Sequence, residues 1–115
     1  MQSTVPLTPA VFHILLALAD RERHGYGIMQ EVSARTDGKV ILGPGTLYGT
    51  INRMLEAGLI KESEERGDPD LNDERRRYYR ITGKGRLAAV TEVERFRGLL
   101  RVARAKRLLQ RPRPI

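Results

Sequence analysis

GPGTLYGTINRMLEAG, residues 43–58, contains the clearest indications of the fold. Proline in the first turn of a helix sacrifices no hydrogen bond, and a glycine such as Gly58 suits the left-handed residue after the last turn. We therefore predict a helix that begins at Gly43-Pro44-Gly45 and runs to Ala57. Its apolar side chains recur at helical spacing and are predicted to face a core: Leu47, Ile51, Met54 and Leu55.

The opposite face of this predicted helix is polar and carries one basic charge, on Arg53. Glycines let a partner approach the backbone closely. Threonine hydroxyls can bind phosphates, and tyrosine, asparagine and arginine can reach phosphates or base edges. An ordinary solvated helix face explains the polarity, but not the glycines, threonines and tyrosine after a Gly-Pro-Gly entry. We predict DNA contacts from this face and its flank, by Gly45, Thr46, Tyr48, Gly49, Thr50, Asn52 and Arg53.

Two shorter helices are predicted ahead of this one. Thr8-Pro9 is typical of a helix start, because the threonine oxygen can cap free N–H groups. The apolar pattern that follows ends at the charged run of residues 20–23. A second helix follows Gly25 and is predicted to end before Asp37-Gly38.

After Gly58 the sequence predicts two strands, residues 59–65 and 75–82, joined by a polar tip at residues 66–74. Three helices followed by a two-stranded wing is the order of a winged helix-turn-helix. In that fold the third helix enters the major groove of DNA, and the wing meets the neighbouring backbone or minor groove. The predicted fold class is therefore mainly α with a small β-hairpin.

The second predicted strand carries four arginines and two tyrosines. Because strand residues alternate between two faces, not all of these arginines can contact DNA. We predict that Arg75 and Arg76, nearest the tip, do so. For Arg77 and Arg80 we favour ion pairs with glutamates of the first strand, and Tyr79 is predicted to be a core residue.

A long last helix is predicted over residues 83–109, with Thr82 as its cap. Apolar side chains repeat along it with spacings of three and four. Such a stripe needs a partner, which could be a second copy of the chain, the chain's own first helix, or both. Residues 1–82 would then form the DNA-binding domain, and residues 110–115 a flexible tail. We predict dimerisation through Ala89, Val93, Phe96, Leu100 and Ala103.

The composition favours a polyanionic partner and gives little support to catalysis. Lysine and arginine number 21 against 14 acidic residues, a net charge of +7, and 17 of the 21 are arginine. Guanidinium groups bind phosphates and guanine edges in bidentate geometry. There is no cysteine, which excludes disulfides and thiolate chemistry. His13 and His24 lack an acid and a nucleophile at motif spacing, and no calcium or phosphate loop is present. We predict no enzyme activity, no metal and no cofactor.

The longest apolar run, residues 11–19, is about half of the ~18 residues expected of a membrane span. No basic residue precedes it and no cleavage pattern follows it, which argues against a secretory signal. We therefore expect a cytoplasmic protein that does not associate with membranes.

Four motifs, taken in order, resemble the PadR family of regulators: Leu7-Thr8-Pro9-Ala10, His24-Gly25-Tyr26-Gly27-Ile28, Gly45-Thr46-Leu47-Tyr48 leading to Gly58-Leu59-Ile60, and Arg77-Tyr78-Tyr79-Arg80-Ile81-Thr82 followed by Gly85. Any one of them is weak, but four in order are specific. The resemblance implies a cytoplasmic bacterial or archaeal transcription factor, in most members a repressor. It also implies an N-terminal winged helix and a C-terminal dimerisation region, and a single last helix looks like the short branch of the family.

Some members of that family bind small aromatic compounds at the dimer interface, so the resemblance leaves open a small-molecule effector. The chain has no tryptophan, and Phe96 is the only aromatic residue of the last helix. The predicted function is sequence-specific binding of double-stranded DNA by a homodimer, with repression at an inverted-repeat operator. The alternative is a winged-helix protein-interaction module that binds no DNA and docks an acidic protein surface.

Overall fold

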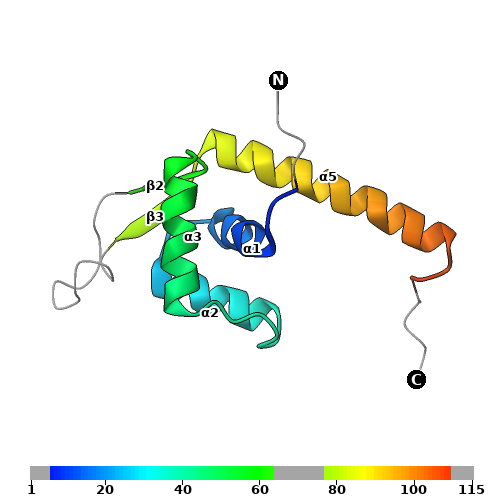
Figure 1. The fold of residues 1–115 in the computed structure, drawn as a ribbon, viewed down its shortest axis with the longest axis horizontal. Coiled ribbons are helices and arrows are strands. Elements are labelled where there is room, and N and C mark those ends of the chain that lie inside the picture. Colours follow the sequence, from blue (N-terminus) through cyan, green and yellow to red (C-terminus); the bar gives the residue numbers. More distant parts are fainter. Residues whose placement is uncertain (1–5, 64–76, 110–115) are drawn as a thin grey trace.

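The computed structural model describes residues 6–63 and 77–109 (Figure 1). Its elements follow the order of a winged helix with one long helix added at the C-terminal end. They are α1 (Pro9–Leu18), β1 (Arg23–His24), α2 (Gly25–Arg35), α3 (Pro44–Glu56), β2 (Ile60–Glu62), β3 (Tyr78–Ile81) and α5 (Gly83–Ala105). The predicted fold class, mainly α with a small β-sheet, is confirmed.

The helices begin where the sequence predicts, because polar side chains bind the free N–H groups of the first turns. Thr8 Oγ1 accepts from the N–H of Val11 at 3.2 Å, and Thr82 Oγ1 accepts from the N–H of Gly85 at 3.0 Å. α3 starts on Pro44 without a side-chain cap.

A residue in the left-handed conformation follows the last turn of α3 and of α5. Gly58, after α3, has φ +78, and its neighbour Leu59 donates from its N–H to the carbonyl of Met54 at 3.0 Å. α5 ends in the same way at Ala105, four residues before the predicted 109. Arg107 takes φ 64 there, and Leu108 donates from its N–H to the carbonyl of Ala103 at 2.8 Å. No glycine marks this stop, so it could not be predicted from the residues around it.

The sheet has three antiparallel strands in the order β1-β3-β2, one more than the predicted hairpin. β1 consists of two residues where the charged run ends, Arg23 and His24, too few for an alternating pattern, and it pairs Arg23 with Tyr79. β2 and β3 are shorter than predicted within the described residues. The predicted tip, residues 66–74, lies outside them.

The core lies where α1, α2, α3 and the sheet meet. The predicted inner face of α3 is buried at Leu47, Ile51 and Met54, and Tyr79 of β3 is 3% exposed, as expected of a core residue. α1 and α2 add the remaining large side chains, which are Ile14, Leu15, Leu18, Ile28 and Val32.

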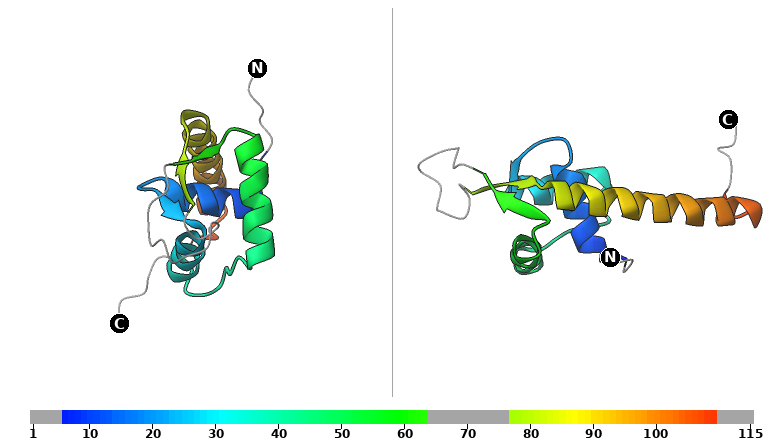
Figure 2. Two further views of the ribbon diagram at one scale, coloured as in Figure 1. Left: turned by 90° about the vertical axis from the view of Figure 1, so that its left-hand side faces the viewer. Right: turned by 90° about the horizontal axis from the view of Figure 1, so that it is seen from above.

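α5 leaves the base of the wing, passes along α1 and extends beyond the body of the molecule (Figures 1 and 2). Its first turn is joined closely to the end of α3. Thr82 Oγ1 donates to the carbonyl of Gly58 at 2.6 Å, and Lys84 Nζ donates to the carbonyl of Ala57 at 2.8 Å. These bonds satisfy backbone carbonyls at the end of α3, which would otherwise lack partners in the protein.

Candidate nucleic-acid interface

α3 crosses one side of the molecule, with α1 behind it and the wing at one end (Figure 1). Turned by 90°, it lies at the outer edge of the body (Figure 2). Because its apolar face is buried, its other face is turned outward. Of the predicted contact residues, Gly45, Thr46, Asn52 and Arg53 are exposed, and Gly49 is half-buried. The structure therefore brings these five residues together on one accessible helix face.

Thr50 was expected on this outer face, and that expectation is wrong. The residue is 1% exposed. It lies three residues after Leu47 and four before Met54, a spacing that places all three on the inner side of the helix. Its hydroxyl accepts a hydrogen bond from Nη2 of Arg53 at 3.2 Å. Thr50 is therefore closed to direct contact with DNA in this conformation, and its hydroxyl is linked to the outer face of α3 through Arg53.

Tyr48 lies on the flank of α3, as predicted, and is half-buried against the start of α2. Its ring occupies the space that a side chain at position 25 would need. A Cβ on Gly25 would come within 2.7 Å of Tyr48 Cζ. The absence of a side chain at Gly25 therefore allows this contact between α2 and α3. The sequence contained both residues but gave no sign that they meet.

The wing contributes β2 and β3 beside α3. Arg77 Nε lies 3.7 Å from Glu62 Oε1, so the predicted cross-strand ion pair is confirmed for Arg77. Arg80 is exposed and lies opposite Lys61 in the register, so the pair predicted for it does not form with a carboxylate among the described residues. Arg75 and Arg76, the predicted DNA contacts of the wing, lie outside the described residues.

Part of the arginine surplus serves the fold itself. Arg23 Nε donates to the carbonyl of Ala17 at 2.7 Å, and Arg86 Nη2 donates to the carbonyl of Ala19 at 3.1 Å. Both bonds satisfy carbonyls at the end of α1, where a positive charge also interacts favourably with the helix dipole. These two arginines are therefore less available to phosphates than the net charge suggests.

Arg35 links α2 to α1. Its Nη2 lies 2.7 Å from Glu31 Oε2 and also donates to the carbonyl of His13 at 3.2 Å, while Nη1 lies 3.0 Å from His13 Nδ1. Burial and the nearby Arg35 charge lower the pKa of His13. The hydrogen bond from Arg35 lowers the pKa of Glu31. As expected from the sequence, His13 has a structural partner, and His24 caps α2 by accepting from the N–H of Gly27 at 2.9 Å.

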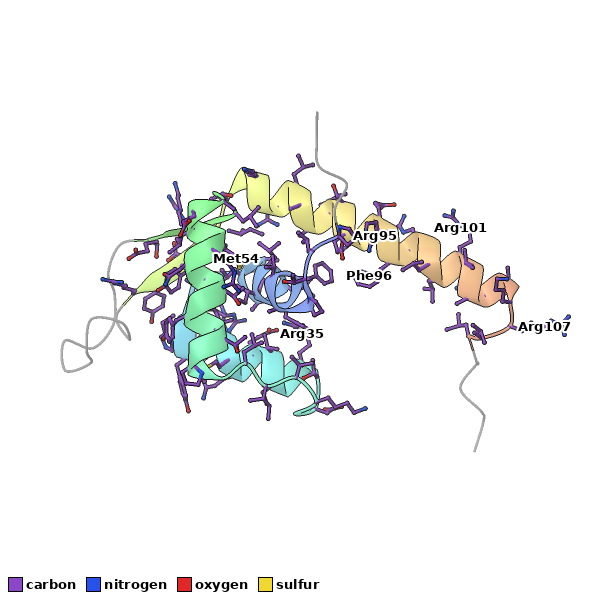
Figure 3. The ribbon with its side chains drawn as sticks, in the orientation of Figure 1. Arg35, Met54, Arg95, Phe96, Arg101 and Arg107 are labelled. Carbon is purple, nitrogen blue, oxygen red and sulfur yellow. The ribbon has the colours of Figure 1, made fainter. Side chains whose placement is uncertain are left out.

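The predicted stripe on α5 is only partly covered by the chain's own α1. The rings of Phe12 and Phe96 have centroids 5.3 Å apart, yet Phe96 remains 48% exposed. Val93 and Leu100 on the same stripe are 41% and 45% exposed, and Ala89 and Ala103 are half-buried. Figure 3 shows Phe96 on the side of α5 nearest α1, while Arg101 and Arg107 lie on the extended part of the chain.

Within residues 6–63 and 77–109, none of the helices has the length and apolar character needed to cross a bilayer. No group of three or more histidine or acidic side chains there is arranged to hold a metal ion.

Residues 14–90 match the model of the transcriptional regulator PadR-like family. A transcriptional regulator of Mycobacterium tuberculosis is 45% identical over 83 residues, which is 72% of this chain and 70% of that relative. A transcriptional regulator from Clostridium thermocellum has a similar structure, with a TM-score of 0.68 and 26% identity over 84% of this chain and 87% of the other. A PadR family regulator from Clostridium difficile shares the fold, with a TM-score of 0.68 and 23% identity over 85% and 97% of the two chains.

The family model spans more than half of the chain, and the fold agrees with it. The resemblance carried by the four sequence motifs is therefore confirmed. Proteins of this family are regulators of transcription and not enzymes. The chain belongs to the PadR-like family of transcriptional regulators.

Proposed function

We propose that the chain represses transcription by binding an inverted-repeat operator as a homodimer, with α3 in the major groove. The observation that carries this proposal is the outer face of α3, where Asn52 and Arg53 are exposed beside residues with small side chains. Asparagine and arginine are the side chains that most often read adenine and guanine edges in bidentate geometry. Gly45 and Thr46, at the start of the helix, allow close approach to the backbone of DNA.

The wing would supply phosphate contacts through Arg75 and Arg76, and Thr46 and Tyr48 would add uncharged ones. Thr50 is left out of the contact set because it is buried. A regulator of this kind works where the chromosome is, so we infer a cytoplasmic location. We keep the proposed division of the chain into a DNA-binding domain, residues 1–82, a dimerisation helix, residues 83–109, and a tail, residues 110–115.

The homodimer is inferred from the stripe on α5. Phe96 and Leu100 are about half-exposed although both are large and apolar. Full burial of such a side chain contributes roughly 1.5–3 kcal/mol, so covering the exposed half contributes roughly 1 kcal/mol each. A second copy could cover them with its own α1 and α5. Two-fold symmetry would then place two α3 helices about one turn of DNA apart, roughly 34 Å, which favours an inverted repeat.

A small-molecule effector at that interface has less support. Phe96 is the aromatic residue that α5 could offer to a ring compound, and its ring already packs on Phe12. We therefore propose regulation by DNA occupancy without assigning an effector.

Selection from fragments of the source genome would test DNA binding and give the operator sequence. Affinity for the selected fragment should fall steeply with salt, because arginine contacts release counterions from phosphates. If about six phosphates are neutralised per dimer, log K should fall against log salt with a slope near −5. A protein-interaction module would recover no consensus sequence and would show no such slope on double-stranded DNA.

The dimer can be tested with a double variant, Phe96→Glu with Leu100→Glu. Sedimentation should give monomers, and operator affinity should collapse because a single half-site contact lacks the linked second one. Val90→Glu is the matched control, since Val90 is 54% exposed on the same helix but lies off the stripe. A double variant that remains dimeric would overturn the assignment of the stripe.

In-vitro transcription from the selected promoter should decrease when wild-type protein is added.

A further inference from the structure

The proposed recognition helix α3 buries the hydroxyl group of Thr50 beside the exposed Arg53. Thr50 and Glu92 are the buried polar side chains within residues 6–63 and 77–109. Thr50 is 1% exposed, and its Oγ1 accepts from Arg53 Nη2 at 3.2 Å. A polar atom removed from water costs free energy unless it has a hydrogen-bond partner. Here the partner is a guanidinium whose remaining N–H groups stay available, because arginine has several donors.

The path of Arg53 is set by the helix and by Gly49. Helical side chains lean toward the N-terminus of their helix, so Arg53 passes over the preceding turn. A Cβ on Gly49 would lie 3.7 Å from Arg53 Nη1, which shows that the guanidinium lies close above the bare backbone of Gly49. Gly49 and Thr50 together therefore form a seat for Arg53 on the outer surface of α3.

We propose that Thr50 is a positioning residue for DNA recognition: its buried hydroxyl holds the Arg53 guanidinium on the face of α3 before DNA is bound. This inference rests on the proposed function, because it makes Arg53 a base-reading side chain. It also assigns a role to Thr50 that differs from the direct phosphate contact expected from its sequence position.

Positioning matters because a free arginine side chain loses conformational freedom when it is fixed against a base. Immobilising such a side chain costs about 0.5–1.5 kcal/mol, which corresponds to roughly two- to tenfold in affinity. If Gly49 and Thr50 already hold the Arg53 guanidinium in place in the free protein, part of that loss is avoided. The gain should appear on the operator, where the guanidinium must meet one base edge, and not on random DNA, where many arrangements are acceptable.

Thr50→Val removes the acceptor oxygen but keeps the branched shape that fills the buried site, and Thr50→Ser keeps the hydroxyl. We expect Thr50→Val to lose at most about two- to tenfold in operator affinity per Arg53 at fixed salt. Affinity for random DNA should be unchanged, and Thr50→Ser should bind the operator nearly as wild type does. In an Arg53→Ala background, Thr50→Val should have no further effect. Thermal unfolding shows whether each variant is folded.

Equal losses on operator and random DNA, or an undiminished effect of Thr50→Val without Arg53, would overturn the inference. A measurement without DNA tests the positioning role of Thr50 separately from the proposed function. Nuclear magnetic resonance relaxation of the Arg53 Nε–H group in the free protein should show a restricted side chain that becomes mobile in Thr50→Val. If the wild type bound no double-stranded DNA, the proposed function would fail, and Thr50 could not be a positioning residue for recognition even if Arg53 were restricted.

Discussion

Gly85 lies where the wing, the end of α3 and the start of α5 meet, and a single methyl group there should destabilise the fold. A Cβ on Gly85 would be 2.9 Å from the carbonyl carbon of Leu59 and 3.0 Å from Ile81 Cγ1, with the carbonyl oxygen of Leu59 closer still. Ordinary Cβ contacts lie at 3.4–4 Å. Because the nearest atoms belong to the backbone, rotation of a side chain cannot relieve the clash, and α5 must move away from Leu59.

The size of the loss follows from two costs and one smaller gain. Overpacking costs roughly 1–3 kcal/mol, occasionally more, and a backbone neighbour places Gly85→Ala at the upper end of that range. The shift would also stretch the 3.1 Å hydrogen bond from the N–H of Thr82 to the carbonyl of Leu59, worth about 1 kcal/mol. The higher helix propensity of alanine offsets up to about 1 kcal/mol of this loss. The net loss of unfolding free energy should be about 2–3 kcal/mol.

Thermal unfolding followed by circular dichroism measures this loss. For a domain of this size, about 2–3 kcal/mol lowers Tm by roughly 10–20 °C. Gly83→Ala is the matched control, because Gly83 starts the same helix and a Cβ there would meet no atom within 4 Å. That variant should unfold at or above the wild-type temperature. If Gly85→Ala unfolded within about 2 °C of Gly83→Ala, the close contact between α5 and Leu59 would be refuted.

Two further outcomes are expected. Gly25→Ala should displace the ring of Tyr48, because the new Cβ would lie 2.7 Å from Tyr48 Cζ. Operator binding should weaken. The free energy of unfolding, measured with urea, should fall by about 1–3 kcal/mol. Acid should destabilise the protein, since the folded pKa values of His13 and Glu31 lie below their ordinary values of 6.5 and 4.5 and the unfolded chain binds more protons. The stability linked to these two groups should be complete above about pH 6.5. It should decrease at lower pH, first through His13 and then through Glu31. His13→Asn should make the decline between pH 7 and 5 shallower; an unchanged slope would exclude His13 as its source.

The order of elements could be predicted because local chemistry and overall fold agree in this chain. Thr8-Pro9 and Gly58 act on the backbone directly, as a cap and as a left-handed residue, and each lies where the structure starts or ends a helix. The burial of Tyr79 followed from the alternation of a strand. These signals depend on neighbours in the sequence, so they can be read without knowledge of the tertiary structure.

The parts that could not be predicted depend on contacts between distant residues or on short elements. β1 has two residues and forms only because β3 offers an unpaired edge. The contact of Tyr48 with Gly25 joins the start of α2 to α3, two residues 23 positions apart in the sequence. Thr50 was misplaced for another reason, since polarity suggested the outer face although its spacing from Leu47 and Met54 puts it inside.

The joint at the start of α5 connects the proposed dimer interface to the proposed recognition helix. Thr82 and Lys84 donate to the carbonyls of Gly58 and Ala57, which directly follow α3, at 2.6 and 2.8 Å. The missing side chain of Gly85 lets α5 approach Leu59. A short, hydrogen-bonded connection leaves little freedom between the two helices. The packing of α5 against a second copy would therefore fix the distance and angle between the two α3 helices, and with them the spacing of the half-sites. Substitutions at this joint should change which spacing is preferred, whereas substitutions on the outer face of α3 should change which bases are preferred.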